Sequence, residues 1–514
     1  MTRGMNIEIL DTTLRDGEQT SGVSFAVQEK LSIASLLLEK IKVNRIEVAS
    51  ARVSDGEFEA VKKIAQWAGK RGHIDKVEVL GFVDGKVSLN WIKDAGCRII
   101  NLLCKGSFNH VTHQLRKTPE QHIADIKEVI ANASEMNIDV NIYLEDWSNG
   151  MKDSRDYVLL MVDSLKDQPI KRFMLPDTLG VLDPHQTYEY CRIMTDRYPE
   201  LRFDFHPHND YDLAVANVEF AVKAGINGVH VTVNGLGERA GNAPLSSVLA
   251  VLHDKLGLKT TLVEKHINHI SRVVESYSGI RIPANKPIIG SNVFTQTAGI
   301  HADGDSKKNL YYNELLPERF GRTREYALGK TSGKANIRKN LEALGIELDE
   351  ESMSKVTQRI IELGDKKEIV TQDDLPYIIS DVLKSDVSND KIKILNFALS
   401  LAHDLKPVAA VKIEINGRQF EESSNGLGQY DAFMGALKKI YGKQLKREFP
   451  VLTSYSVDIP PGGHTDALVQ TVISWDYKGE EIKTRGLDAD QSVAAIKATV
   501  KMLNKIEDME QGGE

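Results

Sequence analysis

The segment that decides the fold reads Ile7-Glu8-Ile9-Leu10-Asp11-Thr12-Thr13-Leu14-Arg15-Asp16-Gly17-Glu18. Its apolar beginning predicts a short β-strand, and the polar residues that follow predict a loop. In that loop Arg15 and Asp16 place a guanidinium group beside a carboxylate. Charged residues directly after a strand are typical of the C-terminal rim of a barrel, where barrel enzymes carry their active sites. The segment therefore predicts a strand that ends in a catalytic loop.

A β-rich run followed by an amphipathic helical stretch recurs through the first half of the chain. Apolar residues with helical spacing stand at Leu31, Ala34, Leu38 and Ile41. The run Thr118-Pro119-Glu120-Gln121 has the form of a capping box with proline at the first helical position. The expected strands span residues 6–11, 45–50, 76–82, 98–104, 139–146, 172–177, 202–208 and 228–235.

Eight strand and helix units, which end near residue 258, are the number that closes a (β/α)8 barrel. We therefore predict an α/β fold with a TIM barrel. The alternative is a doubly wound open sheet, which would use fewer strands and bind its ligand in one crevice. Polar residues follow strand after strand here, as the rim of a barrel requires, so the barrel is favoured.

The composition is that of a soluble enzyme with more than one domain. A length of 514 residues exceeds what one hydrophobic core serves. A net charge of -8 without a cluster of positive charge argues against nucleic acid binding. Only three cysteines occur, too few and too scattered for a disulfide framework. No stretch approaches the roughly 20 apolar residues of a membrane span, so we expect a cytoplasmic protein.

Three parts are predicted along the chain: a catalytic barrel over residues 1–280, small linker subdomains over 281–390, and an α+β domain over 391–514. The last part contains an internal repeat of a β-hairpin and a helix. One hairpin turns at Asn416-Gly417 and the other at Lys478-Gly479. The repeat has few candidate catalytic groups, so we expect it to serve dimerisation and small-molecule sensing. A purely structural part is the alternative.

His206 and His208 stand two residues apart in an expected strand, so their side chains point to the same face. Such a pair by itself is more often simply hydrogen-bonded. Here it ends the seventh strand, while Asp16 follows the first strand, so the three side chains would meet on one rim of the barrel. One carboxylate and two imidazoles suit Mg, Mn or Zn and leave positions open for a bidentate substrate. We therefore predict a divalent metal site.

Other polar residues of the predicted rim fit the same chemistry. Arg15 could stabilise an oxyanion on a coordinated carbonyl group, the role that we favour over a structural ion pair with Glu47 or Glu145. Glu145 is a candidate acid or base, or a substrate clamp, and Asp146 is the competing choice. Thr178 could hold a substrate carboxylate or cap the next helix.

Four motifs occur in one order along the chain. They are LRDGEQ at 14–19, the HPHND set at 206–210, NGLGERAGN at 234–242 and PIIGSNVFTQTAGIHADG at 287–304. Each motif is modest alone, but the four together are highly specific. With them the chain resembles, over nearly its whole length, the α-isopropylmalate synthase, homocitrate synthase and citramalate synthase family of metal-dependent barrel enzymes.

The resemblance implies a Claisen condensation. Acetyl-CoA, the co-substrate, would be deprotonated at its methyl group, the enolate would attack the ketone of a metal-chelated 2-oxo acid, and the thioester would be hydrolysed. The family pattern places metal ligands at Asp16, His206 and His208, with Asn242 near or in the coordination shell.

The resemblance also implies a homodimer with shared active sites. In the family pattern His301 reaches over the site of a neighbouring subunit and serves as the base together with Glu145. Asp303, Asn309 and Tyr311 belong to the same element and are expected to bind substrate. The linker subdomains would thereby complete the active site.

The choice of 2-oxo acid is predicted from the pocket. Leu80, Leu103 and Tyr143 lie late in strands three, four and five, where inward residues would meet the tail of the substrate. A pocket narrowed in this way favours pyruvate, which would give (R)-citramalate for isoleucine biosynthesis. The alternative is that the three side chains pack the barrel core. One or two methylenes are worth only about 1 to 3 kcal/mol of discrimination.

Two other activities stay open. A 2-isopropylmalate synthase acting on 2-oxoisovalerate, in leucine biosynthesis, would use the same metal site. A barrel lyase of the hydroxymethylglutaryl-CoA type shares that site, but it normally carries a cysteine in the loop after strand eight, where GERAGNAPL has none.

For the C-terminal domain we expect feedback inhibition by isoleucine in the citramalate case and by leucine in the isopropylmalate case. The motivation is the paired repeat, with Tyr430, Asp431 and the glycine turns near Gly462-Gly463 as candidate effector residues.

Overall fold

The computed structural model forms two compact units, Met1–Gln372 and Asp373–Glu514. The predicted division into 1–280, 281–390 and 391–514 is finer than these units and stays a prediction. The residues that the structure describes are 7–296, 313–343, 346–365, 370, 375–383, 391–401, 403–458 and 469–511.

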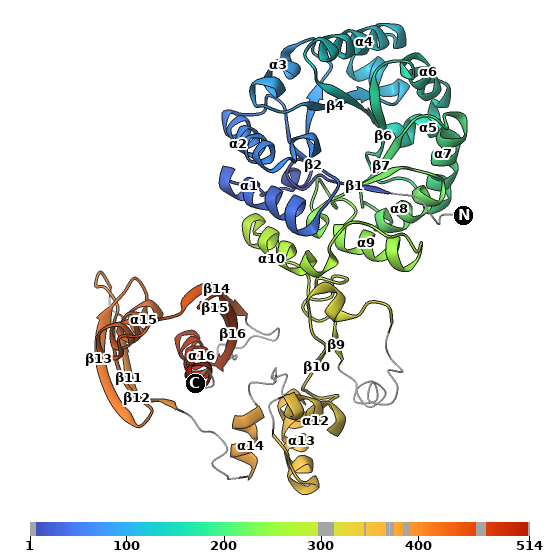
Figure 1. Cartoon of the computed structure of the whole chain (residues 1–514). Helices are drawn as coiled ribbons and strands as arrows, with labels where there is room; N and C mark the ends of the chain where they lie inside the picture. Colours follow the sequence, from blue (N-terminus) through green and yellow to red (C-terminus); the bar gives the residue numbers. More distant parts are fainter. Residues whose placement is uncertain are drawn as a thin grey trace. The chain divides into compact units, whose positions relative to one another are not determined.

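Eight parallel strands close into a barrel in which each strand pairs with the next and β8 pairs with β1. Helices surround this ring of strands, as Figure 1 shows. The predicted α/β fold with a (β/α)8 barrel is confirmed. The strands are β1 (Glu8–Asp11), β2 (Arg45–Ser50), β3 (Val77–Phe82), β4 (Ile99–Lys105), β5 (Asp139–Glu145), β6 (Ile170–Asp177), β7 (Phe203–Pro207) and β8 (Gly228–Val231).

The barrel helices follow the strands with the expected sequence signals. Gln121 donates its backbone N–H to Thr118 Oγ1 at 3.3 Å, and Thr118 N donates to Gln121 Oε1 at 2.9 Å, which is the predicted capping box. The helices are α1 (Val27–Ser35), α2 (Asp55–Arg71), α3 (Val87–Asp94), α4 (Pro119–Glu135), α5 (Trp147–Asp153), α6 (Arg155–Leu165), α7 (Pro184–Arg197), α8 (Ala214–Lys223), α9 (Leu245–Asp254) and α10 (Ile267–Ser278).

The eighth strand is the one that falls furthest short of its predicted end. The expected eighth strand ran to residue 235, but β8 ends at Val231 and the chain turns through the 3-10 helix Val233–Gly235. Asn234 in this turn has a φ of 61°, which a strand cannot accommodate. The turn directs the NGLGERAGN segment across the rim of the barrel.

The main hydrophobic core of the barrel includes side chains of β7 that alternate with polar ones. Phe203 and Phe205 of β7 belong to this core and are fully buried. Between them stands Asp204, also fully buried, which pairs with Arg45 of β2 and Arg172 of β6. Because strand side chains alternate between faces, β7 turns its aromatic residues to the helices and its polar residues to the barrel interior.

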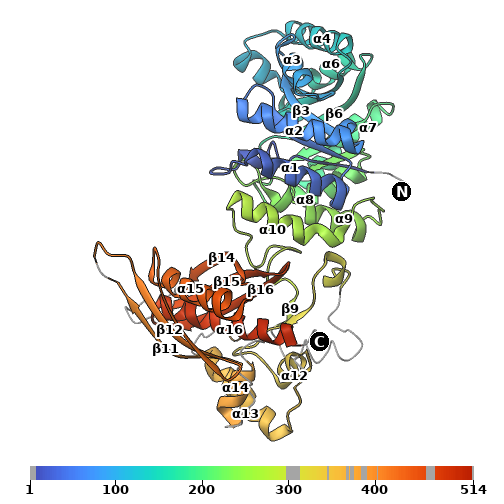
Figure 2. The ribbon, with the colours of Figure 1, turned by 60° about the vertical axis from the view of Figure 1, so that its left-hand side comes forward.

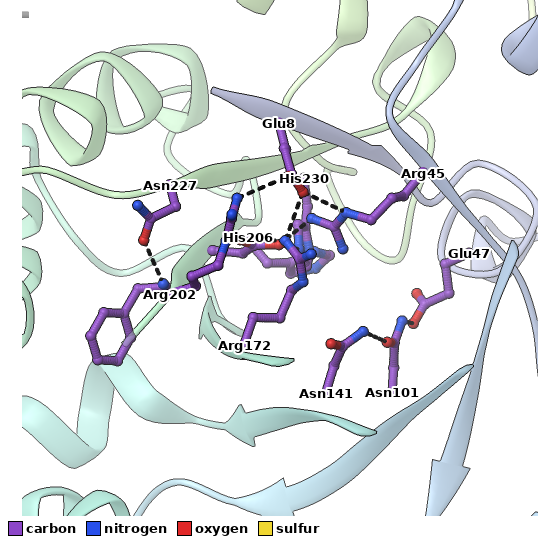
Figure 3. A network of polar contacts seen from close by, with 12 residues as sticks. Glu8, Arg45, Glu47, Asn101, Asn141, Arg172, Arg202, His206, Asn227 and His230 are labelled. Atoms are coloured by element: carbon purple, nitrogen blue, oxygen red, sulfur yellow. Dashed lines mark hydrogen bonds and ion pairs between the residues drawn. The ribbon is translucent and has the colours of Figure 1, made fainter. Parts of the chain in front are cut away.

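Charged side chains at the beginnings of the strands form an ionic layer inside the barrel (Figure 3). Arg45 Nη1 lies 2.9 Å from Glu78 Oε1, and its Nη2 contacts Asp204 Oδ2. Arg172 Nη1 lies 2.8 Å from Glu8 Oε2 and 3.5 Å from Asp204 Oδ1. The layer joins β1, β2, β3, β6 and β7, so it ties strands that are far apart in the sequence.

The remainder of the first unit is smaller and less regular. β9 (Thr295–Gln296) pairs in parallel with β10 (Glu325–Tyr326). Two helices follow, α12 (Lys334–Ala343) and α13 (Glu350–Asp365).

The second unit holds two three-stranded antiparallel sheets, and each is followed by a helix. Figure 2 shows α15 and α16 against these sheets. Phe433, Trp475 and Met502 are buried in the common core that both copies build. The elements are α14 (Leu375–Leu383), β11 (Ile392–Ser400), β12 (Val408–Ile415), β13 (Arg418–Asn425), α15 (Gln429–Lys439), β14 (Val451–Asp458), β15 (Val469–Tyr477), β16 (Glu480–Asp488) and α16 (Gln491–Gln511).

Each copy of the predicted repeat of a hairpin and a helix is longer than expected, because it begins with an additional strand, β11 or β14. Both additional strands lie at a sheet edge and no two-residue turn links them to the hairpin, so the turn signal that revealed the hairpins was absent. Within the described part of the chain, no helix combines the length and apolarity that a membrane crossing needs.

We expect Asp204→Asn to destabilise the barrel. Burial alone would raise the pKa of Asp204, but Arg45, His230 and Arg172 outweigh it and lower the pKa. A lowered pKa gives stability that is fully present above the unfolded-state value of about 3.9 and is lost as the pH falls through the folded value. At pH 7 the variant should lose about 3 kcal/mol of unfolding free energy, because Arg45 stays buried with one partner fewer.

Denaturant titration followed by tryptophan fluorescence at pH 7, 5 and 3 measures this effect. The variant should lose less stability than the wild type between pH 5 and pH 3. Glu135→Gln is the control, since the Lys86 and Glu135 side chains are 51% and 67% exposed and their ion pair should contribute under about 0.5 kcal/mol. Equal pH slopes in the wild type and Asp204→Asn would contradict the prediction.

Candidate metal centre

The three predicted metal ligands lie together at the C-terminal rim of the barrel. Asp16 lies in the loop after β1. His206 is near the end of β7, and His208 is the first residue after that strand. Asp16 Oδ2 is 3.0 Å from His206 Nε2 and 3.8 Å from His208 Nε2. All three residues are buried, and their ligand atoms lie within 4.8 Å of one another. The arrangement has the chemistry of a metal site, and the binding of a metal there stays a prediction.

Buried oxygen atoms that accept no hydrogen bond at this site would suit a bound cation. Neither oxygen of Asp16 accepts a well-directed hydrogen bond, and Asn242 Oδ1 is buried without a donor. Asn242 pairs through its backbone with His208, so it adjoins the predicted ligands. Buried oxygen atoms that accept no hydrogen bond cost free energy, and a divalent cation would remove that cost. Carboxylate, imidazole and amide donors suit Mg, Mn or Zn.

The electrostatic environment keeps Asp16 and His208 in the protonation states that a metal ligand needs. Burial alone would raise the pKa of Asp16, but Arg15, His206 and His208 outweigh it and lower the pKa, so Asp16 is a carboxylate. Burial lowers the pKa of His208 to about 4, against the attraction of Asp16. His208 is therefore neutral at pH 7 and can offer a lone pair.

The loop that carries Arg15 and Asp16 is fixed by its backbone and by a buried lysine. The backbone N–H groups of Arg15, Asp16 and Gly17 all donate to Thr12 O, at 2.8 to 3.1 Å. Lys30 of α1, which is fully buried, reaches the loop on both sides of the charged pair. Its Nζ donates to Leu14 O at 3.1 Å and lies 2.6 Å from Glu18 Oε2.

Arg15 combines the two roles that the sequence left as alternatives. Its Nε lies 2.6 Å from Glu47 Oε2, which is the structural ion pair, while Nη1 lies 3.3 Å from Asp16 Oδ2. Its Nη2 donates to Tyr143 Oη at 3.4 Å. Glu47 thus holds the guanidinium group in place beside the predicted metal ligand Asp16, which suits the predicted catalytic role. The other ion pair that we considered is absent among the described contacts, because Glu145 pairs with Lys105.

Two glycines let the NGLGERAGN loop bring Asn242 close to His208. Gly237 has a φ of 153°, and a Cβ atom there would lie 2.2 Å from Asn242 Nδ2. Gly241 has a φ of 84°, and a Cβ atom there would lie 1.9 Å from Gly235 O. Asn242 Nδ2 donates to Leu236 O at 3.1 Å, so the side chain amide is oriented with its oxygen free. The glycines in this motif therefore serve close packing around Asn242.

The predicted residues at the ends of β5 and β6 have identified partners. Glu145 contacts the Nζ of Lys105, its neighbour in register on β4. Thr178 Oγ1 accepts the backbone N–H of Asp146 at 2.9 Å, so it links two strand ends. The alternative role for Thr178 as a helix cap is wrong, because Asp183 caps α7. Whether Glu145 and Thr178 contact substrate stays a prediction.

The predicted pocket residues share one small cluster in the barrel. Leu80, Leu103 and Tyr143 pack with Leu10 and Met174, separately from the main core. Leu80 and Tyr143 are buried, and Leu103 is partly exposed. The three side chains come from the neighbouring strands β3, β4 and β5, as predicted.

The sequence analysis did not single out several polar residues of the barrel interior. Asn101 Nδ2 donates to Glu47 Oε1 at 2.7 Å, and Asn141 Nδ2 donates to Asn101 Oδ1 at 2.8 Å. His230 of β8 lies beside both His206 and Tyr143. A signal was available, because a polar residue flanked by apolar ones in a barrel strand points inward.

Some predicted residues cannot be placed. His301, Asp303, Asn309, Tyr311 and the Gly462-Gly463 turn lie outside the described residues. In the second unit, the hydroxyl group of Tyr430 lies 2.7 Å from Thr499 Oγ1 and joins α15 to α16. Asp431 Oδ2 accepts the backbone N–H of Leu427 at 2.8 Å. The regulatory role of both residues stays a prediction.

We expect Gly241→Ala to weaken metal binding about 10- to 100-fold, the range for disturbing groups that orient metal ligands. The added methyl group would collide with Gly235 O and displace Asn242 from His208. Gly257→Ala is a matched control, because Gly257 also has a positive φ, 65°, but has nothing within 4 Å of the added Cβ. Titration of the metal-free proteins with Zn²⁺ by calorimetry measures the effect, and equal affinities in the two variants would contradict it.

The chain matches three family models in sequence order. Residues 6–274 match the HMGL-like model, and residues 288–368 match the homocitrate synthase post-HMGL domain-like model. Residues 369–507 match the LeuA allosteric (dimerisation) domain.

Curated relatives match over nearly the full length. The chain is 34% identical to a putative (R)-citramalate synthase of Archaeoglobus fulgidus, over 98% of this chain and 100% of the relative. It is 35% identical to a probable 2-isopropylmalate synthase of Methanopyrus kandleri, over 97% of this chain and 98% of the relative. It is 33% identical to a 2-isopropylmalate synthase of Methanocaldococcus jannaschii, over 97% of this chain and 94% of the relative.

Proposed function

The chain belongs to the HMGL-like family of citramalate and 2-isopropylmalate synthases, and we propose that it condenses acetyl-CoA with pyruvate to give (R)-citramalate and CoA. The observation that carries the proposal is the rim site. There Asp16, His206 and His208 converge, with Arg15 3.3 Å from Asp16.

The residues around the site have the properties that such a condensation requires. A divalent ion held by Asp16, His206 and His208 would act as a Lewis acid on the chelated 2-oxo acid. Arg15 would stabilise the negative charge that develops on the ketone oxygen, and Glu47 keeps it preorganised for this role. Glu145 would take part in proton transfer, and its pairing with Lys105 holds it at the rim.

The preference for pyruvate is supported by the interior cluster. Leu80, Leu103 and Tyr143 pack together with Leu10 and Met174 inside the barrel. Side chains of this size leave little room for a branched tail, whereas the methyl group of pyruvate needs little. The relatives do not discriminate, because both activities occur among their names at 34% and 35% identity. Because some of the relatives are named 2-isopropylmalate synthases, 2-oxoisovalerate is the second candidate substrate.

The lyase alternative is disfavoured by the cysteines. Cys97, Cys104 and Cys191 are all buried, and burial raises the pKa of each thiol. None of them stands in the loop after β8. The cysteine that such a lyase normally carries in this loop is therefore missing from this sequence.

Release of free CoA tests the proposed function directly. With pyruvate the enzyme should release CoA, lose this activity after chelation and regain it when Mg²⁺, Mn²⁺ or Zn²⁺ is added. A thiol reagent measures the product with little background, since all three enzyme cysteines are buried. An equal or higher kcat/KM with 2-oxoisovalerate would refute the choice of pyruvate, and no turnover of any 2-oxo acid would refute the reaction.

Leu103→Ala extends this test to the pocket. Removal of the partly exposed Leu103 side chain should raise the kcat/KM ratio of 2-oxoisovalerate to pyruvate about 10- to 200-fold. Ile100→Val in the same strand is the control, because Ile100 is buried in the main core and not in the interior cluster. An unchanged ratio in Leu103→Ala would place the substrate tail elsewhere.

We further propose that the enzyme is a cytoplasmic homodimer inhibited by isoleucine, or by leucine if 2-oxoisovalerate is the substrate. The match of residues 369–507 to an allosteric (dimerisation) domain supports this. The two copies of three strands and a helix share one core, so a ligand bound to one copy can affect the other.

Truncation after Leu383 should leave CoA release insensitive to isoleucine, because it removes both copies of the repeat. In the intact chain, Tyr430→Phe should raise the isoleucine concentration needed for half inhibition, since it breaks the contact between Tyr430 and Thr499. Inhibition assays with isoleucine and leucine measure both effects. Unchanged inhibition of the truncated enzyme would refute the assignment.

A further inference from the structure

A chain of polar contacts crosses the barrel interior from the ionic layer to a predicted metal ligand (Figure 3). It runs from Asp204 of β7 to His230 of β8 and on to His206 of β7. Phe205 pairs in register with Val229, so the next residues on the two strands, His206 and His230, lie side by side in the interior. His230 is buried, which leaves its ring nitrogens to protein partners.

The contact with Asp204 fixes the tautomer of His230. The Asp204 carboxylate pairs with Arg45 and Arg172, so it can only accept hydrogen bonds. His230 Nε2 lies 3.4 Å from Asp204 Oδ2 and must therefore carry the proton. In a neutral imidazole the other nitrogen, Nδ1, is then an acceptor.

The acceptor nitrogen of His230 in turn fixes His206. His230 Nδ1 lies 3.2 Å from His206 Nδ1 and 2.9 Å from the Tyr143 hydroxyl group. The lone pair of His230 Nδ1 faces His206 Nδ1, so a proton on His206 Nδ1 makes this contact a hydrogen bond, whereas a second lone pair there would repel the first. His206 Nε2 is then left with a lone pair, and this is the atom that lies 3.0 Å from Asp16 Oδ2 in the predicted metal site.

We propose that His230 is a positioning residue that sets the tautomer and ring orientation of His206, so that His206 presents the Nε2 lone pair to the metal ion. Outer partners of metal-bound histidines act in this way in other metal sites. The proposal rests on the metal site of the proposed function. The Tyr143 hydroxyl group lies 2.9 Å from the same nitrogen and accepts from Arg15, so the His230 ring contacts the pocket as well as the ionic layer.

Titration of the metal-free full-length enzyme with Zn²⁺ tests the proposal without any substrate. His230→Leu should raise the Zn²⁺ Kd about 10- to 100-fold. His230→Asn keeps an acceptor near the Nδ1 position, so it should recover part of the lost affinity. Val231→Ala is the control for a merely structural effect. Val231 is buried in the main core from the next position of β8, so its truncation should lower the thermal midpoint and leave the Kd unchanged.

Two outcomes of the titration separate the proposals. A wild-type Zn²⁺ Kd in His230→Leu, or an equal loss of Zn²⁺ affinity in Val231→Ala, would overturn the proposed role of His230 and leave the metal site standing. A wild-type enzyme that binds no more Zn²⁺ than His206→Ala would overturn the metal site, and with it both the proposed function and this inference.

A measurement on the unsubstituted protein covers the case in which His230→Leu does not fold. In the Zn²⁺-loaded enzyme with ¹⁵N-labelled histidine, long-range ¹H–¹⁵N spectra should show His206 protonated at Nδ1 and His230 protonated at Nε2. The His230 signals are assigned by their loss in His230→Asn. A proton on His230 Nδ1 would overturn the proposal.

Discussion

Charges buried inside the barrel must find partners there, and this requirement organises the whole barrel. Asp204 pairs with Arg45 and Arg172, and Glu78 takes another nitrogen of Arg45. A buried ion without a partner costs several kcal/mol, so these strands can close only in a register that brings the charges together. The ionic layer therefore contributes specificity of strand arrangement as much as stability.

The same requirement shapes the C-terminal rim of the barrel. Arg15 is held by Glu47, and Asp16 lies beside Arg15 and His206. The oxygens of Asp16 and Asn242 Oδ1 accept no well-directed hydrogen bond among the described residues, and those atoms would face a cation. The contacts of Arg15 with Glu47 and Asp16 thus hold the rim in the arrangement that the predicted metal site requires.

Between the two ends lie the residues that connect stability to chemistry. His230 joins Asp204 to His206, and Tyr143 joins His230 to Arg15. Leu80 and Leu103 pack against Tyr143 in the same interior cluster. A change in this cluster can therefore reach both the predicted metal ligands and Arg15, which links the interior cluster to the geometry of the rim site.

The sequence by itself determined the eight strands, the barrel and the candidate ligands Asp16, His206 and His208, because local periodicity and strand ends are properties of neighbouring residues. It also revealed two hairpins in the second unit, but it missed the edge strands β11 and β14, which carry no tight-turn signal. Only the tertiary structure decided that Glu47 holds Arg15 and that His230 holds His206. These pairs join different strands, and their contact depends on how the closed barrel sets the register of those strands.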